Sequence, residues 1–114
     1  VIYLGSSDLL RVLSLDAKTG KERWSSPAPG WTWARVAVSP DAVYAGSVGA
    51  QEPFSSRQPG FLSLDRQTGA LRWILRPEHA ETNQMFGFGA DAIIGGGRLF
   101  AVDLEGVIYA FDDP

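Results

Sequence analysis

The apolar residues of this chain fall in short runs that are separated by turns rich in Gly, Pro, Asp and Ser. Short runs with many β-branched and aromatic residues are typical of β-strands, and no segment repeats its apolar residues with the period of a helix. The pattern therefore predicts an all-β fold. The predicted strands are residues 1–5, 12–15, 21–24, 31–38, 42–46, 61–64, 92–94, 99–102 and 107–111, with a further strand that ends at residue 73.

The strands at 12–15, 61–64 and 108–111 are apolar at consecutive positions instead of alternating. A strand in a one-sided sheet alternates apolar and polar residues, so this pattern indicates sheets that are covered on both faces. One aligned position is always small, with Ser14, Ser63 and Ala110. A small residue leaves space beside the strand, and Trp24 and Trp73 are the candidates to fill it.

A sequence repeat explains this regularity. Residues 13–24 and 62–73 share the pattern Leu-Ser-Leu-Asp-x-x-Thr-Gly-x-x-Arg-Trp, and a third strand of the same kind ends at Asp112. The spacing of about 48 residues falls in the range of roughly 40 to 50 that is typical of β-propeller blades. The order of strands predicts one complete four-stranded antiparallel blade between two incomplete ones, with boundaries at 1–29, 30–77 and 78–114.

The pattern Asp-x-x-Thr-Gly-x-x-x-Trp after a small residue resembles the tryptophan-docking motif of the pyrroloquinoline-quinone (PQQ) type β-propellers, with Ser in place of the motif's Ala. The resemblance implies structural roles: the Trp wedges between blades against the small residue and a neighbouring Gly, and the Asp ties down its turn. The residues concerned are Asp16, Thr19, Gly20, Trp24, Asp65, Thr68, Gly69 and Trp73.

Rings of this family commonly have seven or eight blades, so the resemblance implies a partial propeller. Two readings follow: the chain is a fragment of a longer protein, or several identical chains close one ring. Repeat units bury their faces only against neighbours, so self-association is expected if the chain is expressed alone. The chain starts at Val1 without a signal-peptide pattern, which leaves its location open. The resemblance implies a periplasmic or otherwise extracytoplasmic location.

Composition excludes several classes of function. The formal net charge is −3 and no Lys/Arg run is present, which argues against nucleic-acid binding. No apolar run approaches the roughly 18 residues of a membrane-spanning helix. The chain has no cysteine, and hence neither a disulfide nor a thiolate metal site. The single histidine, His79, has only Glu78 and Glu81 nearby in sequence, so neither a metal site nor a catalytic triad is expected.

Long loops at 25–30, 47–60 and 76–88 are expected on one face of the sheets, because alternate connections of a meander emerge on the same side. Functional residues tend to lie on loops held by a rigid scaffold, so this face is the candidate binding surface. For Trp31 and Phe88, burial at the start of a strand is the competing interpretation. The candidate residues are Trp31, Trp33, Phe54, Arg57, His79, Asn83 and Phe88.

The favoured function is a non-catalytic module that binds a protein partner or the remaining blades of its ring. It would resemble the PQQ-like lipoprotein scaffold of bacterial outer-membrane assembly or the sensor domains of some bacterial kinases. The alternative is a piece of a quinoprotein dehydrogenase, which oxidises alcohols or sugars with PQQ and Ca²⁺. Such enzymes often carry adjacent cysteines with Glu, Asn and Asp, but this chain has no cysteine and only Asn83. No cofactor is therefore expected from these residues. A third possibility, a sugar-binding or polymer-binding propeller, rests on Trp31 and Trp33.

Overall fold

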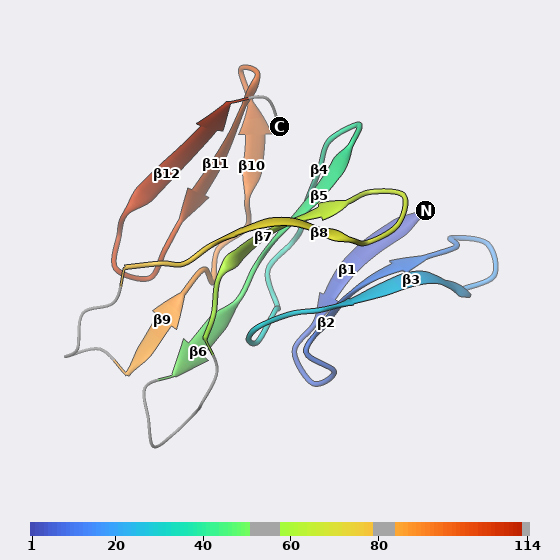
Figure 1. The fold of residues 1–114 in the computed structure, drawn as a ribbon, viewed down its shortest axis with the longest axis horizontal. Coiled ribbons are helices and arrows are strands. Elements are labelled where there is room, and N and C mark those ends of the chain that lie inside the picture. The colour runs from blue at the N-terminus through green and yellow to red at the C-terminus, as the bar shows by residue number, and fades with distance from the viewer. Residues whose placement is uncertain (51–57, 79–83, 113–114) are drawn as a thin grey trace.

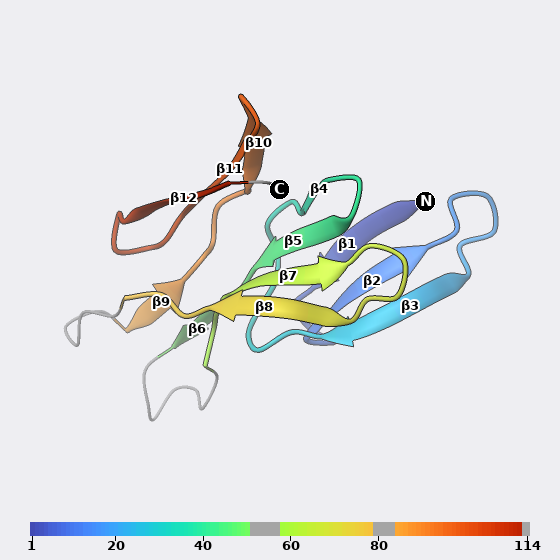
Figure 2. The ribbon, with the colours of Figure 1, turned by 45° about the horizontal axis from the view of Figure 1, so that its top comes forward.

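The computed structural model describes residues 1–50, 58–78 and 84–112, and within these ranges the chain forms β-strands and no helix (Figure 1). Three antiparallel sheets follow one another along the chain and lie face to face (Figures 1 and 2). They contain three, four and three strands. The predicted order of one complete four-stranded unit between two incomplete ones is confirmed, and the fold is that of β-propeller blades.

The first sheet has the order β1-β2-β3, with β1 (Ile2–Ser6), β2 (Arg11–Leu15) and β3 (Glu22–Pro27). The central sheet has the order β4-β5-β7-β8, and the third sheet has the order β10-β11-β12. A small two-stranded sheet joins β6 to β9. The bounds of these strands are β4 (Ala37–Val38), β5 (Ala42–Gly46), β6 (Val48–Ala50), β7 (Phe61–Asp65), β8 (Leu71–Leu75), β9 (Met85–Gly87), β10 (Ile93–Gly95), β11 (Arg98–Val102) and β12 (Ile108–Asp112).

Two hydrophobic cores lie on opposite faces of the central sheet. Toward the first sheet, Val43, Leu62 and Leu64 pack with Val12 and Trp24. Toward the third sheet, the core is aromatic and contains Tyr44, Phe61, Phe88, Trp73 and Phe111, among others. Every residue of β5 is buried. This agrees with the prediction, made from consecutive apolar positions, that the sheet is covered on both faces.

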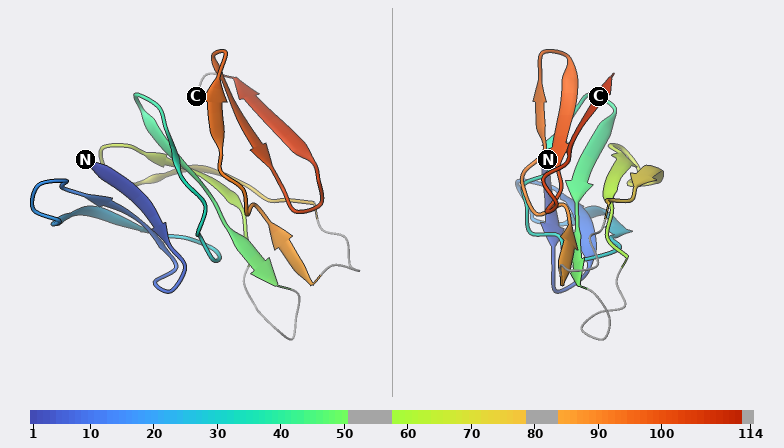
Figure 3. Two further views of the ribbon diagram at one scale, coloured as in Figure 1. Left: turned by 180° about the vertical axis from the view of Figure 1, so that it is seen from behind. Right: turned by 90° about the vertical axis from the view of Figure 1, so that its left-hand side faces the viewer.

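The outer faces of the two flanking sheets are exposed in this chain. Ile93 and Ile108 of the third sheet are 62% and 73% exposed, and Ile2 of the first sheet is 45% exposed. These strands carry the same consecutive apolar pattern as the central ones, but their second face meets solvent. Figure 3 shows the three sheets from behind, with the two flanking ones on either side of β5 and β7.

The structure corrects three sequence-based boundaries. Residues 25–27 belong to β3 and not to a loop. Pro27 can end this strand because β3 lies at the edge of its sheet, where the missing backbone N–H of proline breaks no ladder of hydrogen bonds. The strand expected at 31–38 is reduced to β4, because Trp31 instead pairs with Val48 and Arg35 N–H bonds to Asp91. The loops expected at 47–60 and 76–88 contain β6 and β9, which pair with each other.

Candidate functional site

The two repeated turns are held by their aspartates. Asp16 Oδ1 accepts hydrogen bonds from the N–H groups of Lys18 and Thr19, each at 2.9 Å, and from the Thr19 hydroxyl at 3.2 Å. Asp65 makes the equivalent bonds one repeat later. Gly20 closes the first turn with a φ of 73°. These carboxylates are therefore bound within their own turns.

The same hydrogen bonds lower the pKa of both aspartates below the usual value of 3.8. For Asp16 the largest cause is the backbone N–H of Thr19, followed by that of Lys18. For Asp65 the largest cause is the backbone N–H of Thr68, which outweighs the opposing effect of desolvation. A carboxylate stabilised in this way stays ionised at neutral pH and is a poor general acid or base.

Trp24 joins the first sheet to the central one. It lies opposite Ser14 on the neighbouring strand, and its Nε1 donates a hydrogen bond of 2.9 Å to the carbonyl of Arg66. Its indole packs on Gly69, where a Cβ atom would come within 2.6 Å of the ring. Ser26 Oγ donates a hydrogen bond to the carbonyl of the same glycine. These contacts hold one sheet on the turn of the next.

Trp73 lies in the second interface, between the central and third sheets. Its ring centroid is 6.0 Å from that of Tyr44, 6.2 Å from that of Phe61 and 5.1 Å from that of Phe111. Both tryptophans of the repeat are thus packed between sheets.

The loop residues predicted as a binding surface separate into different environments. Trp33 is 55% exposed, whereas Phe88 is 1% exposed and belongs to the aromatic core, so the Phe88 side chain does not reach the surface. Trp31 is half-buried, and its backbone pairs with Val48. The other four candidates, Phe54, Arg57, His79 and Asn83, lie outside the described residues.

A groove of about 450 Å³ lies beside Trp33, between β1 and the segment that leads into β4. We call it the Trp33 groove. The Trp33 Nε1 donates to the Gly89 carbonyl at 3.2 Å, and the Arg35 N–H donates to Asp91 Oδ1 at 2.7 Å. Its lining includes Tyr3, Gly5, Trp33, Arg35, Val36 and Asp91.

Arg66, which is not part of the groove lining, holds Tyr3 in place. Arg66 Nε donates to the Tyr3 hydroxyl at 3.1 Å, and the guanidinium carbon lies 5.8 Å from the centre of the Tyr3 ring. Sequence reasoning missed Tyr3, Arg35 and Asp91 because they come from three segments that only the fold brings together. Only Trp33 carried a sequence signal, as an aromatic residue near the start of the strand predicted at 31–38 and close to a predicted loop.

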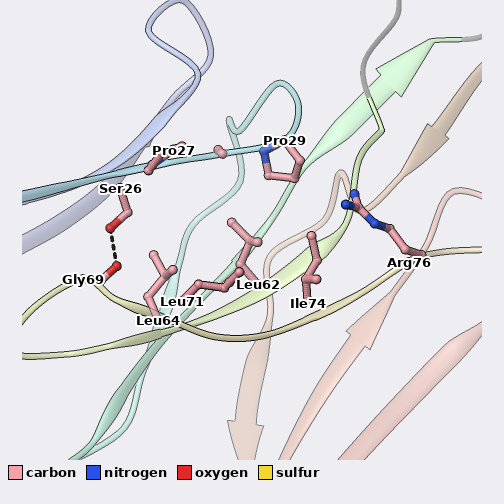
Figure 4. A pocket seen from close by; sticks show the side chains of 10 residues that line it. Ser26, Pro27, Pro29, Leu62, Leu64, Gly69, Leu71, Ile74 and Arg76 are labelled. Atoms are coloured by element: carbon pink, nitrogen blue, oxygen red, sulfur yellow. Dashed lines mark hydrogen bonds between the residues drawn. The ribbon is translucent and has the colours of Figure 1, made fainter.

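A second groove, of about 350 Å³, lies between β3 and the central sheet. We call it the intersheet groove. Figure 4 shows apolar side chains of β7 and β8 pointing toward Pro27, the last residue of β3, and toward Pro29 just beyond it, with Arg76 at one end. The lining is mostly apolar and includes Pro27, Pro29, Leu62, Leu64, Leu71 and Ile74.

Within the described part of the chain, no three His, Asp or Glu side chains gather to hold a metal ion. The same ranges contain no helix with the length and apolarity needed to cross a membrane. Together the linings of the two grooves present an indole, a phenol, guanidinium groups, one carboxylate and apolar surface.

Comparison with solved structures finds chains of similar fold, and comparison by sequence finds none. No protein-family model matches the chain, and no curated protein is similar enough to count as a relative. The crystal structure of BamB from Moraxella catarrhalis matches with a TM-score of 0.40 and 18% sequence identity. The match covers 96% of this chain and 45% of BamB, so the chain spans less than half the length of that structure.

Proposed function

We propose that this chain is a non-catalytic part of a PQQ-like β-propeller and that it binds another protein. The observation that carries the proposal is the composition of the Trp33 groove, where Tyr3, Trp33 and Arg35 line one hollow. Tryptophan, tyrosine and arginine are the residue types that most often carry the binding energy of protein interfaces. An extracytoplasmic location is part of the proposal and rests on the motif resemblance.

Hydrogen bonds hold the side chains of Trp33 and Tyr3 and the backbone at Arg35, which favours binding. More than half of the Trp33 surface is exposed, while its N–H is held by the Gly89 carbonyl. The backbone at Arg35 is held by Asp91, and the Tyr3 hydroxyl by Arg66. Side chains that are ordered before a partner arrives lose less conformational freedom on binding, so more of the contact energy becomes affinity.

The alternative, a quinoprotein dehydrogenase with PQQ and Ca²⁺, does not fit the described residues. Calcium takes six to eight oxygen ligands. The Trp33 groove offers one carboxylate, Asp91, which already accepts a hydrogen bond from the Arg35 N–H. We therefore assign no step of such a reaction to this chain. The motif resemblance remains the reason to test the activity directly.

Cross-linking in the natural host tests the proposal. The protein that contains this chain would be cross-linked in cells, and its partners compared for the unchanged sequence, Trp33→Ala and Arg35→Ala. Arg98→Ala is the matched control, because Arg98 is also exposed but lies on the third sheet. We expect a partner that is lost with the two groove variants and kept with the control.

An enzyme assay tests the alternative. The same purified protein would be given PQQ and Ca²⁺ and assayed with alcohols and sugars and a redox dye. The proposal predicts no turnover above a sample without PQQ. Turnover, or a set of partners that none of the variants changes, would overturn the proposed function.

A further inference from the structure

We propose that the intersheet groove binds an extended segment of a partner protein, which inserts an aliphatic or aromatic side chain and places a carboxylate on Arg76. This inference rests on the proposed function, since it names the chemistry of a partner for a protein-binding module. It concerns a surface separate from the Trp33 groove, because the residues that line the two grooves do not overlap.

The groove suits an apolar side chain. Its volume of about 350 Å³ lies within the range of roughly 300 to 1,000 Å³ that is typical of ligand sites. In Figure 4, Leu62, Leu71 and Ile74 form one wall and the prolines at 27 and 29 lie across from them. Leu71 is 59% exposed, although it stands beside buried Leu64. An inserted side chain would remove this apolar surface from water.

Both walls of the groove belong to sheets that the chain itself contains. A hollow on the outer face of the third sheet, lined by Ile93, Phe100 and Ile108, is different, because nothing in the structure shows what covers it. In the intersheet groove, Trp24 and Ser26 already join β3 to the central sheet. The hollow that remains after this packing is a surface of the assembled pair of sheets.

The edge of β8 can hold an extended backbone. Among the described residues, β8 is the last strand in the order β4-β5-β7-β8, so its side away from β7 presents backbone N–H and C=O groups. Such an edge can pair with an added strand, whose backbone gives affinity and whose alternate side chains give specificity. Side chains of an added strand alternate between the two faces, so every second one would face the groove.

Arg76 sets the charge of the partner. One terminal nitrogen of its guanidinium donates to the carbonyls of Gln58 and Pro59, which orients the group at the end of the groove. A guanidinium has five N–H donors, so these contacts leave donors for a planar acceptor. A carboxylate matches that geometry and charge, and bonds between charged partners are stronger than neutral ones.

Selection from a displayed library of random decapeptides against this chain tests the inference. We expect enriched sequences with two apolar residues two positions apart and an Asp or Glu beside them. A selected peptide, labelled for fluorescence anisotropy, should bind Leu71→Ser and Arg76→Gln at least about tenfold more weakly than the unchanged chain. Replacing the peptide's acidic residue by its amide should abolish the effect of Arg76→Gln.

Matched controls keep this test specific. Ile93→Ser changes a residue that, like Leu71, begins a strand, and the two are 62% and 59% exposed. Arg98→Gln changes an exposed arginine on the third sheet. Both controls should bind the peptide like the unchanged chain. If Leu71→Ser failed to fold, Arg76→Gln would still decide, because the Arg76 side chain is exposed.

Three results would overturn the inference: no enriched peptide, equal binding by all variants, or self-association in sedimentation that Leu71→Ser abolishes, which would make the occupant a second copy. These outcomes are distinct from failure of the proposed function. A cross-linked partner that depends on Trp33 but not on Leu71 or Arg76 would leave the function standing and remove this inference alone. A partner that depends on none of them would remove both.

Discussion

Two glycines at the same place in the repeat offer a direct test of how the sheets are joined. Gly20 and Gly69 both have positive φ, at 73° and 76°. A Cβ atom added to Gly20 would meet nothing within 4 Å. A Cβ atom added to Gly69 would lie 2.6 Å from the Ser26 hydroxyl and 2.6 Å from the Trp24 ring. The backbone cost is shared, and only the contact with the neighbouring sheet differs.

The expected magnitudes follow from this geometry. Alanine at a left-handed position costs about 1–2 kcal/mol, so Gly20→Ala should lower the free energy of unfolding by that amount. In Gly69→Ala the indole must also move, which costs about 1–3 kcal/mol as overpacking. The movement weakens the bond from Trp24 to Arg66, which adds about 1 kcal/mol. Gly69→Ala should therefore be less stable than Gly20→Ala by about 2–4 kcal/mol.

Urea unfolding followed by far-UV circular dichroism measures this difference without relying on tryptophan emission. For a domain of this size the difference corresponds to roughly 8–16 °C in the thermal midpoint. A Trp24→Leu background provides the control, because the extra cost of Gly69→Ala over Gly20→Ala should then shrink to the part that the Ser26 hydroxyl imposes. Equal losses from the two glycine variants in the unchanged background would refute the idea that the Trp24 contact joins the sheets.

Three further predictions concern stability. Trp73→Ala should lower the free energy of unfolding by about 3 kcal/mol, because the indole packs against three rings; an unchanged thermal midpoint would contradict this. The pKa values of Asp16 and Asp65 are lowered on folding, so the stability that their ionised carboxylates contribute is present above about pH 4 and is lost as pH falls further. When the free energy of unfolding is measured down to acid pH, the double Asp→Asn variant should therefore lose less stability than the unchanged chain. Burial, and then a 3.0 Å hydrogen bond to Asp103, raise the pKa of Tyr109 above 10.0, so its stabilisation is present below about pH 10 and lost above it; Tyr109→Phe should be less stable at neutral pH by about 1–3 kcal/mol and lack this alkaline loss in the same titration.

The sheets could be predicted from the sequence because their signals are local. Each hairpin is a pair of apolar runs around a turn, and the repeat at 13–24 and 62–73 fixes which strands correspond. The strand β5 was predicted with the bounds that it has in the structure. Consecutive apolar positions in these strands indicated a sheet packed on two sides, and this holds for the central sheet.

The pairing of β6 with β9, inside two segments predicted as loops, could not be predicted in this way. β6 and β9 are three residues each, contain glycine and pair across a long stretch of sequence. Strands of three residues are too short to show the alternation of apolar and polar residues that distinguishes a strand from a loop. The same limit applies to Trp33 and Phe88: both are aromatic residues near predicted strand starts, and only the packing of the third sheet decides that Phe88 is buried.

The contact made by Trp24 has a direction, and this has a consequence for assembly. The first sheet contributes the tryptophan, and the central sheet contributes the turn with Arg66 and Gly69 that receives it. The central sheet in turn presents Trp73 to the third sheet. Such a head-to-tail interface is heterologous and contains no twofold axis that would end growth after two units. Growth ends only when the rotation between successive units returns to the first one. The angle set at each tryptophan, more than its affinity, therefore determines whether such units form a closed ring or an open filament.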